Sequence, residues 1–163
     1  IFYNSMFESK IEYHGYASLG NTANVSGSFV SDGCVINGTV ENSILFPGVS
    51  IEEKAVIKDS IILPHNRIGA GSRITRTVID ERTEQPLEHD SLNIGIRCRI
   101  GTDTEQLKSS SYPRALFKSI SLIGKNCSLP EGVNVGGASY VASGKTEEDF
   151  AKKKYIYDGL SLD

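Results

Sequence analysis

Large aliphatic residues recur along the chain at a spacing of five or six positions. Between Ile44 and Asp80 they stand at Leu45, Ile51, Ile57, Leu63, Ile68, Ile74 and Ile79. On an α-helix this step would scatter the side chains over three faces. One long strand would keep them on one face, but glycine, asparagine and proline interrupt the stretch too often. The pattern therefore predicts a chain that turns after each short strand, as in a parallel β-helix of hexapeptide repeats.

The fifth position of each six-residue unit supports this interpretation. It is small or apolar in most units, as Val49, Ala55, Ile61, Ser72 and Val78, with Arg67 as the exception in a shortened unit. Three units would form one triangular coil of about eighteen residues, and stacked coils would bury a continuous aliphatic column. Cys98 and Cys127 fall on the same fifth position, so we expect buried structural thiols there.

The repeat defines the expected organisation of the chain. It extends over 23–145, and polar stretches near 81–93 and 102–121 break it as loop insertions, which in solenoids often carry the binding face. Residues 1–22 hold irregularly spaced aromatic residues and are expected to be a lead-in segment or linker from another domain. Over 146–163, Thr146 followed by three acidic residues predicts a short capping helix at the C-terminal end.

Composition narrows the class of protein. The net charge is −3, so no global field favours nucleic acid or an anionic membrane, and no run of eighteen apolar residues is present. Three cysteines without metal or redox spacing favour a reducing compartment, which predicts a cytoplasmic protein. The chain begins with IFYNSMF as though in the middle of a strand, and we expect it to be a piece of a longer protein.

Motifs for catalysis are scarce. The sequence has no glycine-rich phosphate loop, no dinucleotide-binding fingerprint and no nucleophile elbow. His14, His65 and His89 lack metal-ligand spacing. His65 follows Pro64 at an expected corner, where it is either a solvated turn residue or the general base of an acyltransferase of the hexapeptide class.

Basic residues recur along the coils: Lys54, Lys58, Arg67, Arg73, Arg76, Arg97, Arg99, Arg114, Lys118 and Lys125. Lys58 and Arg76 are eighteen positions apart and are expected to be neighbours one coil apart, with Arg73 beside them. Such a group would hold a phosphorylated metabolite, or would form an ordinary solvated face balanced by acidic residues. The residues predicted to bind an anionic effector are Lys58, Arg73, Arg76, Arg82, Arg114 and Lys152.

Four phrases are more specific than a generic repeat: SDGCVINGTVENSILF, GVSIEEKAVIKDSI, RIGAGSRITRTVID and SLIGKNCSLPEGVNVGG. They resemble the C-terminal β-helix domain of bacterial ADP-glucose pyrophosphorylase (glucose-1-phosphate adenylyltransferase), strongly over 25–80 and less so over 119–137. The resemblance implies left-handed winding. The expected fold is therefore all-β, a left-handed parallel β-helix of hexapeptide repeats with loop insertions and a short C-terminal capping helix.

The resemblance also implies a function. Members of that family make ADP-glucose and pyrophosphate from ATP and glucose 1-phosphate for glycogen biosynthesis, with ATP and Mg²⁺ held by an N-terminal nucleotidyltransferase domain. The β-helix domain packs on that domain, helps to form a tetramer and contributes to sites for phosphorylated allosteric effectors. The chain would then be non-catalytic, with no cofactor and no catalytic residue of its own.

Two departures from the family pattern keep other functions open. Glu81 follows Asp80 where family members often place a basic residue, and both insertions are long. A non-catalytic paralogue therefore remains open. So do an acyltransferase that uses His65 and an assembly module without a ligand.

Overall fold

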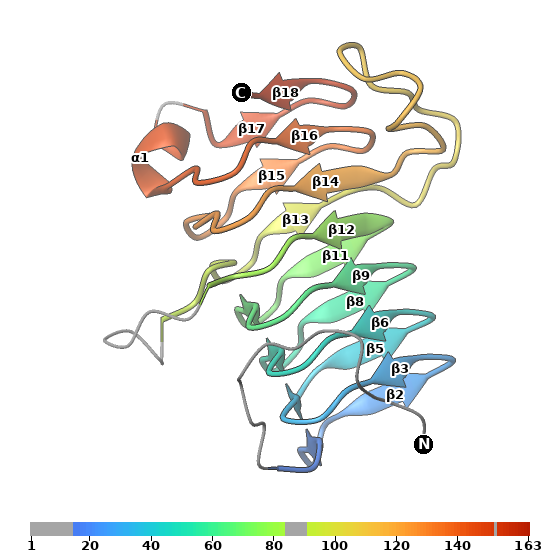
Figure 1. Ribbon diagram of the computed structural model, residues 1–163, viewed down its shortest axis with the longest axis vertical. Helices are drawn as coiled ribbons and strands as arrows, with labels where there is room; N and C mark the ends of the chain where they lie inside the picture. The colour runs from blue at the N-terminus through green and yellow to red at the C-terminus, as the bar shows by residue number, and fades with distance from the viewer. Residues whose placement is uncertain (1–14, 84–90, 152) are drawn as a thin grey trace.

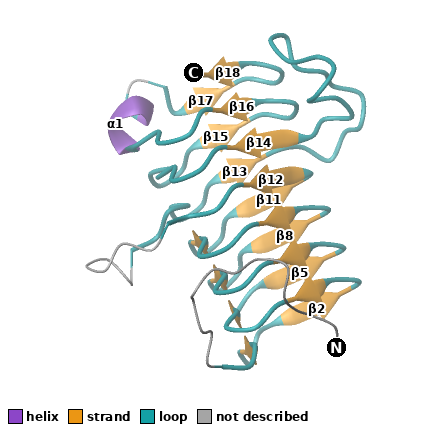
Figure 2. Cartoon of the chain, in the orientation of Figure 1, coloured by secondary structure: helices purple, strands orange, loops and turns teal. Residues whose placement is uncertain are grey.

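Short parallel strands stack into three sheets along one axis in the computed structural model (Figure 1). The structure describes residues 15–83, 91–151 and 153–163. Each of the first four turns contributes one strand to each sheet, and the later turns contribute strands to two of the sheets. Neighbouring strands in a sheet come from successive turns, as Figure 2 shows. The protein is therefore a parallel β-helix, as the hexapeptide pattern predicts, and it agrees with the left-handed winding that the family resemblance implies.

The sheets are named here sheet A, sheet B and sheet C. Sheet A contains β1 (Ser18–Leu19), β4 (Val35–Ile36), β7 (Ser50–Ile51) and β10 (Arg67–Ile68), and isolated bridges extend it through Ile94 to Leu129. Sheet B contains β2 (Asn24–Ser26), β5 (Thr39–Glu41), β8 (Val56–Lys58), β11 (Arg73–Thr75), β13 (Arg99–Ile100), β15 (Asn134–Val135) and β17 (Tyr155–Ile156). Sheet C contains β3 (Phe29–Val30), β6 (Ile44–Leu45), β9 (Ile61–Ile62), β12 (Thr77–Ile79), β14 (Ser121–Ile123), β16 (Tyr140–Val141) and β18 (Ser161–Leu162).

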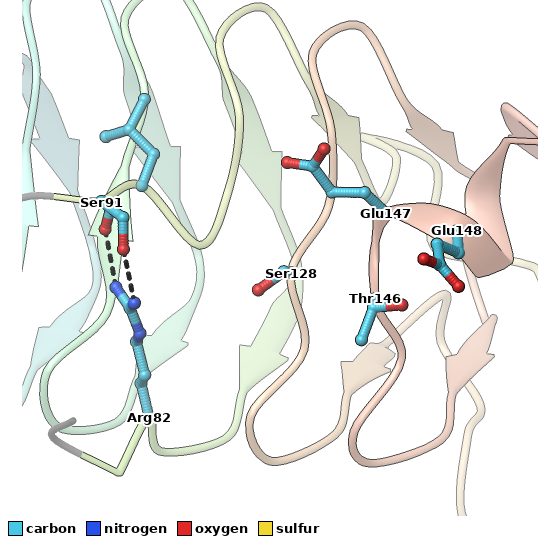
Figure 3. A pocket seen from close by; sticks show the side chains of 7 residues that line it. Arg82, Ser91, Ser128, Thr146, Glu147 and Glu148 are labelled. Atoms are coloured by element: carbon cyan, nitrogen blue, oxygen red, sulfur yellow. Dashed lines mark hydrogen bonds between the residues drawn. The ribbon is translucent and has the colours of Figure 1, made fainter. Parts of the chain in front are cut away.

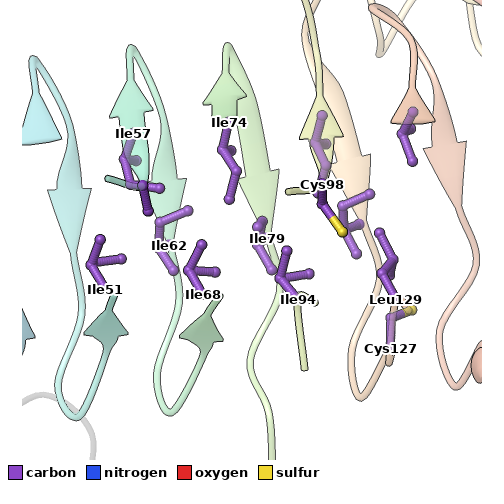
Figure 4. Packing of buried hydrophobic residues seen from close by; sticks show 14 of the residues in the cluster. Ile51, Ile57, Ile62, Ile68, Ile74, Ile79, Ile94, Cys98, Cys127 and Leu129 are labelled. Atoms are coloured by element: carbon purple, nitrogen blue, oxygen red, sulfur yellow. The ribbon is translucent and has the colours of Figure 1, made fainter. Parts of the chain in front are cut away.

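A column of aliphatic side chains fills the interior (Figure 4). Ile51, Ile57, Ile68 and Ile74 are all fully buried, as the six-residue spacing predicts. Cys98 and Cys127 are buried in the same column, which confirms the prediction of structural thiols. Because each turn alone exposes its inner face, this stacked column supplies the hydrophobic stabilisation of the fold.

The register around Leu63 differs from the prediction. Ile62 is fully buried, whereas Leu63 is only partly buried on the outer side. Ile61 is 37% exposed and Val78 is partly buried, so neither is the inward fifth member that the pattern predicted. The step from Ile57 to Ile62 has five residues, and a slip of one residue in a strand moves every side chain to the opposite face.

The same five-residue step sets the length of the coil. Strand partners in the regular middle of the solenoid are 17 residues apart, as in the contact between Ser60 and Ser43, instead of about eighteen. The shortened step lies at the corner between sheets B and C. There Asn42, Asp59 and Arg76 lie above one another with φ of 47°, 49° and 48°. This left-handed conformation, which is uncommon for residues other than glycine, lets the chain turn within few residues.

Hydroxyl side chains form a ladder inside that corner. Ser43 Oγ accepts a hydrogen bond from the backbone N–H of Ser60 at 3.1 Å, and Ser60 Oγ accepts one from Thr77 N–H at 3.1 Å. Each hydroxyl also donates to the carbonyl two residues before it, as Ser60 does to Lys58 at 2.6 Å. All three side chains are buried, so the ladder satisfies backbone groups that the tight corner leaves without strand partners.

The two insertions leave the solenoid at different corners. The segment 81–93 follows β12 at the corner between sheets C and A, and 102–120 joins β13 to β14 at the corner between sheets B and C. The two insertions therefore do not leave the solenoid at one shared corner.

The helix near the C-terminus takes the place of a strand. Helix α1 (Glu147–Phe150) lies between β16 and β17, where the other turns pass through sheet A. Thr146 N–H donates to the Asp149 carboxylate at 2.8 Å, and Phe150 is fully buried in the core. The range 146–163 thus contains this helix and two further strands, β17 and β18, which pair with β15 and β16. Within the described ranges, no helix has the length and apolar character needed to cross a bilayer.

Candidate functional site

Lys58 and Arg76 do not stack as the sequence analysis expected. Lys58 lies opposite Thr75, because the coil has 17 residues rather than eighteen. Arg76 lies instead above Asp59, with its guanidinium 3.9 Å from the Asp59 carboxylate. The two residues are nevertheless neighbours along the corner, since the backbone N–H of Arg76 donates to the Lys58 carbonyl at 3.1 Å.

Acidic residues of the 102–120 insertion face both cations. Arg76 donates to Glu105 at 2.6 Å, and Lys58 Nζ lies 3.9 Å from the Asp103 carboxylate. These pairs are largely exposed and contribute about 0–1 kcal/mol each to stability. Their main consequence is local: the insertion neutralises the two basic residues that were predicted to bind an anion together.

Arg73 has a different environment. It points outward from sheet B, where its partner on the next strand is Arg99. Both side chains are exposed, and within the described ranges neither makes an ion pair or a side-chain hydrogen bond. Arg99 was not among the residues predicted to bind an effector. The sequence contains a signal for this pairing, because Arg73 and Arg99 occupy the same place in the repeat. Each stands directly before an inward isoleucine, Ile74 or Ile100.

Arg82 lies in an open groove of about 580 Å³ beside the 81–93 insertion (Figure 3). Its guanidinium donates to the Ser91 carbonyl at 2.6 Å and to Ser91 Oγ at 2.7 Å. Glu147 and Glu148 of helix α1 line the same groove. A groove with two carboxylates and an arginine bonded to its own chain is poorly suited to an anionic ligand.

The other predicted residues lie elsewhere. Arg114 is exposed in the 102–120 insertion, and Lys152 lies outside the described residues. His65 is partly buried at the corner between sheets C and A, with φ of 62°. Its backbone N–H donates to the Pro47 carbonyl at 3.2 Å. The described residues contain no group of three or more His, Cys, Asp or Glu side chains placed to hold a metal ion. The six predicted effector residues therefore do not form a single cluster.

An apolar column on the outer face of sheet C was missed by the sequence analysis. Strand pairing places Phe29, Ile44, Ile61, Val78, Leu122 and Tyr140 in one line. Phe29 is 76% exposed and Ile61 37% exposed. At the far end, Tyr112 of the 102–120 insertion packs edge-on against Tyr140, with ring centroids 5.3 Å apart. We call this set the sheet C column. It was missed because Ile61 and Val78 had been assigned to the interior.

Comparisons with known proteins agree with the fold. A family model described as GlmU-like, C-terminal hexapeptide matches residues 16–110. Glucose-1-phosphate adenylyltransferase of Acetivibrio thermocellus is 31% identical over 132 residues, which cover 81% of this chain and 29% of that protein. The enzyme of the same name from Bacillus thuringiensis strain Al Hakam is 38% identical over 61 residues, 37% of this chain and 16% of that protein.

The chain spans less than a third of the length of these curated relatives. The matching region in the chain is the repeat-bearing solenoid, which agrees with a C-terminal hexapeptide region rather than with a whole enzyme. The chain therefore belongs to the GlmU-like C-terminal hexapeptide family and is homologous to the C-terminal part of glucose-1-phosphate adenylyltransferase.

Proposed function

We propose that this chain is the regulatory and assembly domain of a glucose-1-phosphate adenylyltransferase and is not catalytic by itself. The observation that carries the proposal is the match of 132 residues, 81% of the chain, to only 29% of the Acetivibrio thermocellus enzyme. Synthesis of ADP-glucose and pyrophosphate from ATP and glucose 1-phosphate, with Mg²⁺, would belong to an N-terminal nucleotidyltransferase domain of the same protein. This agrees with the lack of any phosphate-loop motif in the 163 residues.

An activity assay tests the first part of the proposal. The purified chain is incubated with ATP, glucose 1-phosphate and Mg²⁺, and ADP-glucose and pyrophosphate are measured. The Acetivibrio thermocellus enzyme serves as the positive control under the same conditions. We expect no product from the chain alone, and ADP-glucose formation that scales with the amount of chain would refute the proposal.

The sheet C column supports the assembly role. Large apolar residues in register on an outer sheet face form a continuous patch. Such a patch favours contact with another polypeptide, whereas apolar residues scattered singly over a surface do not. We assign this face to contact between copies of the chain within a homo-oligomer. Phe29→Ser and Ile61→Ser should shift the molar mass measured by light scattering toward the monomer, whereas Tyr157→Ser, at an exposed site outside the column, should not. A wild-type chain that stays monomeric at high concentration would contradict this part.

The regulatory role requires a phosphorylated effector. Thermal-shift measurements with phosphate, sulfate, AMP and fructose bisphosphate separate a regulatory domain from an assembly module without a ligand. A ligand that binds only the folded state stabilises it, by up to a few kcal/mol at saturation. The melting temperature therefore rises. Absence of any shift would favour the assembly module.

The acyltransferase alternative depends on the corner position of His65. A general base at a corner would reach substrate in a cleft between subunits. Binding of an acyl-coenzyme A that is lost in the His65→Ala variant would favour this alternative. Under the proposed function, the His65→Ala substitution does not change the affinity of the chain for an acyl-coenzyme A.

A further inference from the structure

Arg73 and Arg99 lie directly opposite each other on neighbouring strands. Their Cα atoms are register partners in the pairing of β11 with β13, which lie side by side in Figure 1. Neighbouring strands are about 4.8 Å apart, and side chains at paired positions leave the sheet on the same face. The inward residues that follow, Ile74 and Ile100, are buried, so both arginines point to solvent.

The carboxylates that follow β13 and precede β15 in the chain are engaged by other cations. Glu131 accepts a hydrogen bond from Arg97, and this contact lowers the pKa of Glu131. Asp103 faces Lys58. In the part of the chain that the structure describes, no carboxylate forms an ion pair with Arg73 or Arg99. Two like charges at paired positions repel each other, although the chain as a whole carries a net charge of −3.

The same line of sheet B continues with residues that suit a polar ligand. Asn134 follows Arg99 on β15, and Tyr155 follows Asn134 on β17. Tyr155 is 63% exposed, and the Asn134 amide donates to the Gly132 carbonyl at 3.2 Å. Two guanidinium groups side by side present planar donor pairs that match the oxygens of a phosphate group, and their combined charge matches a dianion.

We propose that Arg73 and Arg99 together bind the phosphate group of a phosphate monoester on the outer face of sheet B. A bound dianion removes the repulsion between the two guanidinium groups and occupies donors that are otherwise exposed to solvent. This replaces the site predicted around Lys58 and Arg76, whose charges are met by Asp103 and Glu105. The proposal deepens the regulatory part of the proposed function, but it does not require the parent protein to be active.

The test compares melting temperatures of the full chain in inorganic phosphate and in sodium chloride at equal ionic strength. The variants are Arg73→Gln, Arg99→Gln and the double substitution, with Lys108→Gln as the control at an exposed loop position. We expect phosphate to raise the melting temperature of the wild type and of Lys108→Gln by several degrees. Each single variant should lose most of this shift, and the double variant should lose all of it.

A second readout separates ligand binding from simple packing by the arginines. At low salt without phosphate, Arg73→Gln should melt at the same temperature as the wild type or higher, because it removes the repulsion with Arg99. A lower melting temperature there, or a phosphate shift that is equal in the wild type and the double variant, would overturn the proposal. So would a wild type that does not respond to phosphate.

Glucose 1-phosphate and sulfate serve as further probes. A monoester that binds at least as tightly as inorganic phosphate, with sulfate also competing, supports the site, whereas a site that takes inorganic phosphate but excludes the monoester contradicts it. ADP-glucose synthesis by the chain would refute the proposed function without affecting this result. Insensitivity to phosphate would refute the Arg73–Arg99 site alone.

Discussion

The side-chain amide of Asn93 donates a hydrogen bond to the side-chain oxygen of Asn66 at 2.7 Å, inside the solenoid. The two residues are 27 positions apart, because the 81–93 insertion separates them. Asn93 Oδ1 also accepts the backbone N–H of Arg67 at 2.6 Å, and Asn66 Nδ2 donates to the carbonyls of Leu63 and Asp80. The amide pair thus provides the hydrogen bonds that a regular rung would supply where the insertion interrupts the stack.

Replacing Asn66 by Ala should destabilise the protein by about 1–3 kcal/mol, because the buried Asn93 amide and two carbonyls lose their partner. Urea unfolding measured by circular dichroism gives the change in the free energy of unfolding. The matched control is Asn24→Ala, at an exposed position of sheet B, which should stay close to the wild type. Equal stability of the two variants would show that the amide pair contributes nothing.

The corrected register makes Ile62 and Leu63 a direct comparison. Ile62 is fully buried, so Ile62→Ala should cost about 2–5 kcal/mol from lost burial and the cavity that remains. Leu63 lies on the outer side and is partly buried, so Leu63→Ala should cost much less. Thermal and urea unfolding measure both. A larger loss for Leu63→Ala would restore the register that the six-residue spacing predicted.

The hydroxyl ladder predicts a clear difference between two substitutions of Ser60. Ser60→Ala removes the acceptor of Thr77 N–H and should cost about 1–3 kcal/mol, since the position is buried. Ser60→Thr keeps the hydroxyl, and Thr77 already occupies the equivalent place in the next turn, so this variant should remain near the wild type. If both variants are equally destabilised, volume and not hydrogen bonding governs the corner.

Burial raises the pKa of the Cys98 thiol above its ordinary value, and it does the same for Cys34 and Cys127. A raised pKa in the folded state means that the unfolded chain ionises first. The contribution of the thiols is therefore complete below about pH 8.5 and is lost as the pH rises toward the folded-state pKa. Between about pH 8 and pH 10, the free energy of unfolding should therefore fall less in Cys98→Ala than in the wild type. Ser110→Ala, at an exposed site, should follow the wild-type slope.

The contact between Tyr112 and Tyr140 fixes the 102–120 insertion to sheet C. Tyr112→Ala should remove an interaction worth about 0.5–1.5 kcal/mol and leave the melting temperature nearly unchanged, because the core does not depend on the insertion. Trypsin should then cut faster after Arg114 and Lys118, which both lie in that insertion. Tyr157→Ala, at a 72% exposed position, is the control and should not alter the cleavage rate.

Much of the fold could be predicted because the repeat carries local information. A bulky side chain at each sixth position must be covered, and only a turning, stacked chain covers all of them, as the burial of Ile51, Ile57 and Ile74 confirms. The start of a helix at Thr146 and the buried thiols of Cys98 and Cys127 follow from the same local rules. The candidate site was less predictable. Lys58, Arg73 and Arg76 were placed near one another, but their partners were not foreseen.

The sequence alone determined the solenoid, its buried column and the places where the repeat breaks, since these depend on the spacing of side chains within one turn. Only the tertiary structure decided that Ile62, and not Leu63, points inward, because five-residue and six-residue steps differ by a single corner residue. It also decided that Arg76 meets Glu105 while Arg73 faces Arg99. Such pairings depend on the length of each coil and on the path of an insertion without a repeat, and neither property is contained in the spacing of the hydrophobic residues.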